Sequence, residues 1–121
     1  MIRWLIRAAR FLRENLKRRG PRWIDIGAVD EFPFNAARVV VRRGVPIAVF
    51  HDETGISVIG DICPHMGASL SEGTLHPDGS VECPAHRMRF HLKTGACSIG
   101  PVYSARVFRF RRQNGRLEAF L

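Results

Sequence analysis

Two short segments of the sequence each place a histidine close behind a cysteine. His65 follows Cys63 after one intervening residue, and His86 follows Cys83 after two. Each cysteine is followed directly by a proline, and the turn-forming sequence Pro77–Gly79 between the segments allows them to face each other. Because thiolates and imidazoles are strong metal ligands, these four side chains predict one metal site.

Two kinds of metal centre suit two thiolates and two imidazoles. A tetrahedral array of all four holds zinc in a closed, structural site. The same set holds a [2Fe–2S] cluster when both thiolates bind one iron and both imidazoles bind the other. A common zinc-finger order groups the cysteines together and the histidines together, whereas here they alternate. Alternation favours the cluster, since each segment then supplies one ligand to each iron.

The composition is that of a soluble globular protein, with 45% hydrophobic and 25% charged residues in a chain of 121. This length predicts one domain, and no apolar stretch reaches the roughly 18 residues that suggest a membrane-spanning helix. The third cysteine, Cys97, is interpreted as a small buried hydrophobic residue. Cysteines that pair with histidines are typical of a reducing compartment, so we expect a cytoplasmic location.

The net charge of +8 is concentrated at the N-terminus. Residues 1–22 hold eight basic residues and one acidic residue, whereas residues 23–121 hold eleven and ten. A nucleic-acid-binding surface would lie on the folded body and include aromatic residues, so no nucleic-acid partner is expected. No Ser/His/Asp arrangement, phosphate-binding glycine loop or carboxylate pair is recognisable. The sequence therefore gives no indication of substrate chemistry in the chain itself.

The first 19 residues have the periodicity of an amphipathic helix. The centre of its apolar face is formed by Ile2, Leu5, Ala9, Leu12 and Leu16, the edges by Trp4, Ile6 and Phe11, and the opposite face by Arg3, Arg7, Arg10, Glu14 and Lys17. Gly20-Pro21 ends the helix. We expect residues 1–22 to form a basic helix that docks through residues 1–19 on a membrane surface or a partner. The alternative is packing against its own domain.

The remainder of the chain consists of short β-like runs separated by turn residues. Strands are expected at residues 23–29, 37–41, 46–51, 56–61, 80–83, 89–92, 105–111 and 117–121. Asn114-Gly115 and Pro77–Gly79 have the chemistry of hairpin turns. Eight short strands at this spacing predict an all-β antiparallel sandwich or barrel-like domain.

The sequences "CPHMGASL" and "CPAH", with "SEGTLHPDGSV" between them, resemble the two cluster-binding loops of the Rieske family. The resemblance covers residues 23–121, and "IGP" at Ile99–Pro101 is similar to the proline-containing loop that covers the cluster in that family. It implies a Rieske-like antiparallel β-sandwich with a small cluster-binding subdomain, and one [2Fe–2S] cluster per chain. By resemblance, Cys63 and Cys83 hold the inner iron, and His65 and His86 hold the outer, near-surface iron.

Within this family, the sequence is similar to the low-potential Rieske ferredoxins. In the high-potential relatives an extra cysteine in each loop forms a disulfide, and here those positions correspond to Ala68 and Ala85. Those relatives also place Ser and Tyr hydroxyls against the cluster sulfurs, where this chain has Met88 and Phe90. Since hydrogen bonds to sulfur stabilise the reduced cluster, their loss predicts a reduction potential of about −150 mV.

Several residues are expected to support the cluster or to contact a partner. They are Met66, Gly67, Arg87, Met88 and Pro101. Gly67 is interpreted as a backbone position that lets amides approach cluster sulfur. Arg87 replaces a glycine that often follows the second ligand histidine, and with Arg89 it is positioned to attract an acidic partner or to raise the potential.

These features predict a one-electron carrier that takes electrons from a reductase and passes them to a terminal oxygenase or a similar redox partner. The first alternative is the small Rieske-like subunit of an assimilatory nitrite reductase, which "MRFHLKTGACSIG" resembles around Cys97. The second is a Rieske subunit docked in a membrane-associated redox complex, peripheral on the cytoplasmic face. Structural zinc is the remaining, less favoured interpretation.

Overall fold

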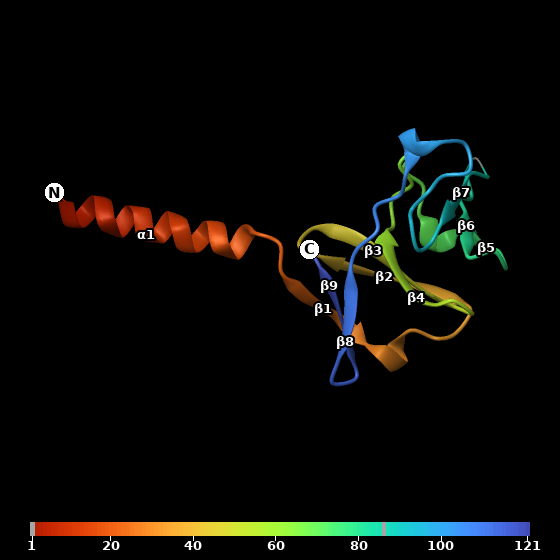
Figure 1. Ribbon diagram of the computed structural model, residues 1–121, viewed down its shortest axis with the longest axis horizontal. Helices are drawn as coiled ribbons and strands as arrows, with labels where there is room; N and C mark the ends of the chain where they lie inside the picture. Colours follow the sequence, from red (N-terminus) through yellow and green to blue (C-terminus); the bar gives the residue numbers. More distant parts are fainter. Residues whose placement is uncertain (1, 86) are drawn as a thin grey trace.

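The computed structural model describes residues 2–85 and 87–121, with the backbone alone described for residues 14–19. It has one α-helix, α1 (Ile2–Arg19), which ends just before Gly20-Pro21 as the sequence predicts. The described body of the chain is built from short strands and 3₁₀ turns (Figure 1). The expected all-β fold with an N-terminal helix is thus confirmed.

The nine strands of the described residues form three antiparallel sheets of three strands each. The first has the order β1 (Trp23–Ala28), β9 (Arg116–Phe120) and β8 (Phe110–Gln113). The second has the order β2 (Ala36–Arg42), β3 (Val45–Asp52) and β4 (Gly55–Gly60). The third, smaller sheet has the order β5 (Thr74–Leu75), β6 (Ser80–Glu82) and β7 (Arg89–His91). Three 3₁₀ turns, η1 (Val29–Glu31), η2 (Leu70–Glu72) and η3 (Pro101–Tyr103), interrupt the connections.

The second sheet is the centre of the fold because β3 is buried on both faces. Ile47 and Val49 belong to one core cluster, together with Ile26 and Leu117 of the first sheet. Their neighbour Phe50 points to the opposite side and joins a second core cluster with the third sheet. Since side chains alternate along a strand, an uninterrupted apolar run is what a strand between two layers requires. The third sheet and its loops are therefore fixed to the body by their own core.

Two strands, β5 and β8, differ from the prediction. A strand was expected at residues 105–111, but β8 begins at Phe110. The segment before it runs beside β4 and forms only an isolated bridge between Ile59 and Val107, with a backbone hydrogen bond from Phe108 to Val58 (2.9 Å). The apolar alternation was real, but the chain leaves β4 before a continuous ladder forms. The two-residue strand β5 was also missed, since two residues carry no periodic signal.

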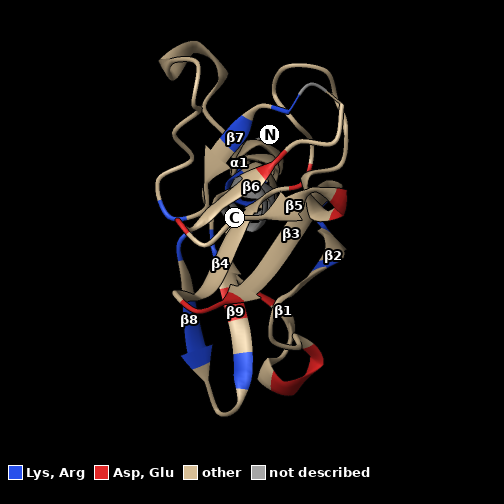
Figure 2. Cartoon of the chain, turned by 90° about the vertical axis from the view of Figure 1, so that its right-hand side faces the viewer, with Lys and Arg blue, Asp and Glu red and all other residues tan. Residues whose placement is uncertain are grey.

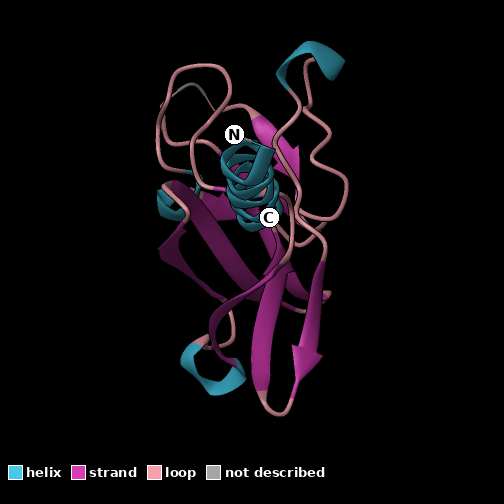
Figure 3. Cartoon of the chain, turned by 90° about the vertical axis from the view of Figure 1, so that its left-hand side faces the viewer, coloured by secondary structure: helices cyan, strands magenta, loops and turns pink. Residues whose placement is uncertain are grey.

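The helix α1 and the small sheet lie at opposite sides of the molecule. In Figure 1 α1 projects to one side, and the small sheet β5–β6–β7 lies at the other side of the body. Figure 3 shows most of the strands in the lower part of the domain, whereas the upper part consists mainly of loops. Among the described residues, no helix is long and apolar enough to cross a membrane.

Candidate metal centre

The first cysteine loop is a compact hydrogen-bonded turn. The Cys63 amide donates to the carbonyl of Ala68 (2.7 Å), and the Gly67 amide donates back to the carbonyl of Cys63 (2.9 Å). Closing the turn requires a left-handed backbone at Gly67, with φ of +75°. A Cβ atom there would meet nothing within 4 Å, so the glycine is needed for its backbone conformation rather than for space.

The second cysteine loop repeats this turn residue for residue. The Cys83 amide donates to the carbonyl of Met88 (2.7 Å), and the Arg87 amide donates to the carbonyl of Cys83 (3.0 Å). Arg87 holds the position equivalent to Gly67 and is likewise left-handed, with φ of +57°. Two loops of one design therefore present their cysteines in the same way.

A buried carboxylate holds the first loop in place. Asp61 is 7% exposed and accepts a hydrogen bond from the amide of Ser71 (2.8 Å) and another from the hydroxyl of Ser69. The Leu70 amide donates to the carbonyl of Asp61 (2.7 Å), which closes the base of the loop. The sequence analysis did not predict these contacts. The signal that could have indicated them is an aspartate directly before the loop with serines directly after it.

The second loop is held by partly exposed charges around Glu82. A carboxylate oxygen of Glu82 lies 3.1 Å from Nε2 of His76 and 3.7 Å from Nε of Arg89. Nearby, the hydroxyl of Ser80 donates to Asp78 (2.6 Å) and holds the pKa of this carboxyl below its usual range. The amide of Ser80 also donates to this carboxyl (3.1 Å), and the two hydrogen bonds fix the turn between β5 and β6.

The two thiols meet in one buried cluster. Cys63 is 2% exposed and Cys83 is fully buried, and both belong to the second core cluster with Phe90. Met88 is buried in the same cluster, while Ala68 is packed against its edge. Met88 and Phe90 contribute to this cluster apolar side chains that donate no hydrogen bond.

The cysteines form no disulfide. This holds for Cys63, Cys83 and Cys97, all in the described part of the chain. Cys97 was interpreted as a buried residue, but it is only partly buried: it packs against the edge of the second core cluster and forms an isolated bridge with Phe90.

His65 lies at the boundary between this core and the surface. Its ring is partly buried, with the Nδ1 atom shielded from solvent. Tyr103 of η3 packs against the ring edge-on, with centroids 5.0 Å apart and planes at 89°. This brings η3, which follows directly on the proline-containing loop, against the first cysteine loop. The contact was missed from the sequence, since it depends on tertiary packing.

His86, the fourth predicted ligand, lies outside the described residues. Among the described residues, no three side chains of His, Cys, Asp or Glu lie close enough together to hold a metal ion. A [2Fe–2S] cluster of the mixed type takes two protein ligands on each iron. The donor set of two buried thiols and a half-buried imidazole fits such a cluster in chemistry and in burial.

The loops around the centre expose large apolar side chains. Four large side chains on the cysteine and proline loops are more than half exposed: Ile62, Met66, Ile99 and Val102. Pro101 is also exposed, as is Arg87. We call the first four the apolar collar. An exposed apolar group of this kind is typical of a surface that contacts another protein.

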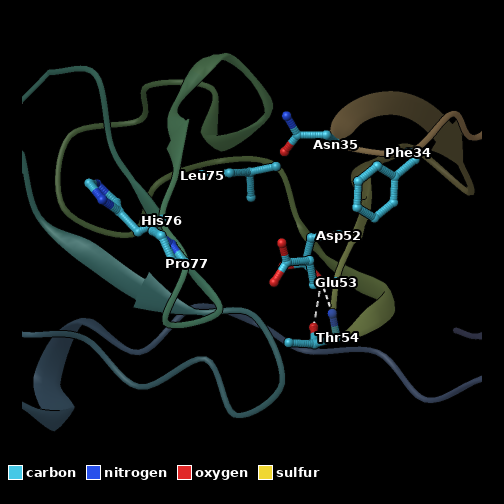
Figure 4. A pocket seen from close by; sticks show the side chains of 8 residues that line it. All are labelled: Phe34, Asn35, Asp52, Glu53, Thr54, Leu75, His76 and Pro77. Carbon is cyan, nitrogen blue, oxygen red and sulfur yellow. Dashed lines mark hydrogen bonds between the residues drawn. The ribbon is translucent and has the colours of Figure 1, made fainter.

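A cavity elsewhere on the domain does not involve the cysteine loops. It measures about 210 Å³ and lies between the β3–β4 turn and the β5–β6 turn (Figure 4). Asp52, Glu53 and Thr54 line one side, and Leu75 and His76 the other. Asp52 is engaged by Thr54, whose amide donates to it (2.9 Å). The cavity and the metal centre are thus separate features.

Comparison with known proteins identifies the family. The model of the Rieske [2Fe-2S] domain matches residues 22–118. This chain belongs to the Rieske [2Fe–2S] family. As a Rieske protein it carries one [2Fe–2S] cluster per chain and functions as an electron carrier.

Its relatives include both carriers considered from the sequence. It is 39% identical over 99 residues to the anthranilate 1,2-dioxygenase ferredoxin subunit of Burkholderia cepacia, covering 79% of this chain and 89% of that one. Among solved structures it resembles a chain from a complex of reduced oxygenase and oxidized ferredoxin in carbazole 1,9a-dioxygenase (TM-score 0.71, 32% identity, 81% of this chain and 92% of that one). It also resembles a protein of Mycobacterium tuberculosis assigned as an NADH-dependent nitrite reductase small subunit (TM-score 0.75, 25% identity, 84% and 96%).

Proposed function

We propose that this Rieske protein is the ferredoxin component of an oxygenase system, carrying single electrons from a reductase to a terminal oxygenase. The observation that carries the proposal is the apolar collar beside a half-buried histidine, which offers a partner protein close access to the redox centre. The likeness to a ferredoxin subunit of a dioxygenase supports the choice of acceptor.

In this proposal Cys63 and Cys83 bind the inner iron, and His65 and His86 bind the outer iron. When bound, the cluster supplies one reversible electron per cycle. The chain's own contribution is to hold two thiolates in a dry core, where Met88 and Phe90 give no hydrogen bonds to sulfur. The buried Nδ1 of His65 suits a metal ligand, and Tyr103 fixes the plane of its ring. Gly67 and Arg87 shape the two turns that present the ligands.

The domain organisation of the proposal has two parts. Residues 23–121 form the Rieske unit, and residues 1–22 form a docking helix for a membrane surface or a partner protein. We place the protein in the cytoplasm, with peripheral attachment through the helix.

A second candidate is the small subunit of a nitrite reductase. The likeness to the protein of this assignment from Mycobacterium tuberculosis is what favours it. The two candidates differ in the acceptor, which is an oxygenase in one case and a sirohaem enzyme in the other.

Electron transfer from the reduced holoprotein separates the two candidates. The reduced holoprotein is mixed anaerobically with the oxidised oxygenase of a dioxygenase system or with a sirohaem nitrite reductase. Reoxidation of the cluster is then followed by its visible absorption. We expect fast reoxidation by the oxygenase, slowed at least tenfold by Ile99→Glu plus Val102→Glu in the apolar collar. The matched control, Val39→Glu plus Val41→Glu on β2, adds the same charges at exposed valines outside the collar and leaves the rate unchanged. Transfer to the nitrite reductase alone would contradict the proposal.

A further inference from the structure

The helix α1 exposes an unusually large apolar surface. Its six large apolar side chains up to residue 13 are between 58% and 73% exposed: Ile2, Trp4, Leu5, Ile6, Phe11 and Leu12. In Figure 1 the helix projects away from the domain rather than lying on it. Large apolar side chains that are exposed together on one element are typical of a contact site.

The arrangement of side chains around the helix is that of an interfacial helix. At 100° per residue, Ile2, Leu5 and Leu12 lie on one side, whereas Arg3 and Arg7 lie on the other. The aromatic rings of Trp4 and Phe11 fall at the border between the two faces, where amphipathic aromatic residues contact both lipid and headgroups. A helix that combines one apolar face with an arginine-rich opposite face lies in the plane of a bilayer surface instead of crossing it.

The positive charge of α1 indicates what kind of surface the helix binds. Residues 2–13 contain four arginines, Arg3, Arg7, Arg10 and Arg13, and no acidic residue. A second copy of the helix would supply no acidic group from residues 2–13 to complement these arginines, unlike the opposite charges that flank paired helices. The domain itself offers little attraction, since residues 23–121 have eleven basic and ten acidic residues, interspersed in Figure 2. Anionic lipid complements both the charge and the apolar face.

The attachment of the helix leaves the redox end accessible. Arg43 donates to the carbonyl of Gly20 (2.9 Å) and to that of Leu121 (2.9 Å), so the connection is fixed beside β1 and β9. The cysteine loops lie on the far side of the domain from α1 (Figure 1). A helix bound to a surface therefore does not cover the apolar collar.

We infer that α1 anchors this electron carrier in the plane of an anionic lipid bilayer, with the apolar face in the acyl boundary and the arginines at the headgroups. The inference rests on the docking role proposed for residues 1–19 and names its partner. It is independent of which protein accepts the electron.

Binding of the full-length holoprotein to vesicles tests the inference. Co-sedimentation is measured with phosphatidylcholine vesicles containing phosphatidylglycerol and with pure phosphatidylcholine vesicles. We expect strong binding to the anionic vesicles, at least tenfold weaker binding to the neutral ones, and a loss of at least 100-fold in Leu5→Glu plus Leu12→Glu. Replacing Arg3, Arg7 and Arg10 by Gln weakens binding about fivefold per residue, whereas replacing them by Lys preserves it.

Two controls keep the outcomes distinct. Val39→Glu plus Val41→Glu adds the same two charges on the domain, and its binding stays within a few-fold of the unchanged protein. The visible spectrum and midpoint potential stay the same in every variant, so a failure here does not touch the proposed redox function. Equal binding to neutral and anionic vesicles, or no binding to either, would overturn the inference.

Discussion

The two cysteine loops share one backbone design but are stabilised in different ways. Both close a turn in which the cysteine amide and carbonyl are hydrogen-bonded, and both require a left-handed residue four positions after the cysteine. The first loop uses glycine there and is held from below by the buried carboxylate of Asp61. The second uses Arg87 and is held by partly exposed ion pairs of Glu82.

This difference shows that the turn, rather than a particular residue, is what the metal centre needs. A left-handed conformation costs a residue other than glycine about 1 kcal/mol. The second loop carries that cost at a residue whose charged side chain is exposed. The first loop is the better anchored and the less strained of the two.

Removing the carboxylate that holds each loop should lower the stability of the protein by very different amounts for the two loops. We expect Asp61→Ala to lower the free energy of unfolding by about 3 kcal/mol, because two hydrogen bonds to a buried charged group are lost. Glu82→Ala should cost less than about 1 kcal/mol, because its ion pairs are partly exposed. Thermal unfolding, followed by the visible absorption of the cluster, measures both. Equal losses would show that the loops are anchored alike.

Substituting the left-handed residue of each loop should change the stability less, and in opposite directions for the two loops. Gly67→Ala should destabilise the protein by about 1 kcal/mol through backbone strain alone, as nothing crowds the added Cβ. Arg87→Gly should stabilise it by up to about 1 kcal/mol, the relief of strain being partly offset by the greater freedom of glycine in the unfolded chain. The same thermal measurement applies. A destabilised Arg87→Gly variant would mean that the arginine side chain itself supports the loop.

Much of this structure follows from local sequence signals. The end of α1 at Gly20-Pro21, the hairpin at Asn114-Gly115 and the uninterrupted apolar run of β3 are each fixed by residues close in the chain. The sequence also predicts that Cys63 and Cys83 belong to one site, and both thiols lie in one core cluster.

The features that were missed depend on tertiary packing. The contact of Tyr103 with His65 joins residues 38 positions apart, and nothing near either residue announces it. The start of β8 at Phe110 depends on where the chain separates from β4. The left-handed Arg87 was recognisable in principle, because aligning the two loops on their cysteines places it opposite Gly67.

The central claim is that two cysteines and two histidines share one [2Fe–2S] cluster. Pulsed electron paramagnetic resonance of the dithionite-reduced holoprotein, with isotopically labelled histidine, tests it most directly. We predict couplings to two histidine nitrogens bound to the cluster, together with a midpoint potential of about −150 mV. Coupling to one histidine nitrogen or to none would contradict the ligand set of Cys63, His65, Cys83 and His86.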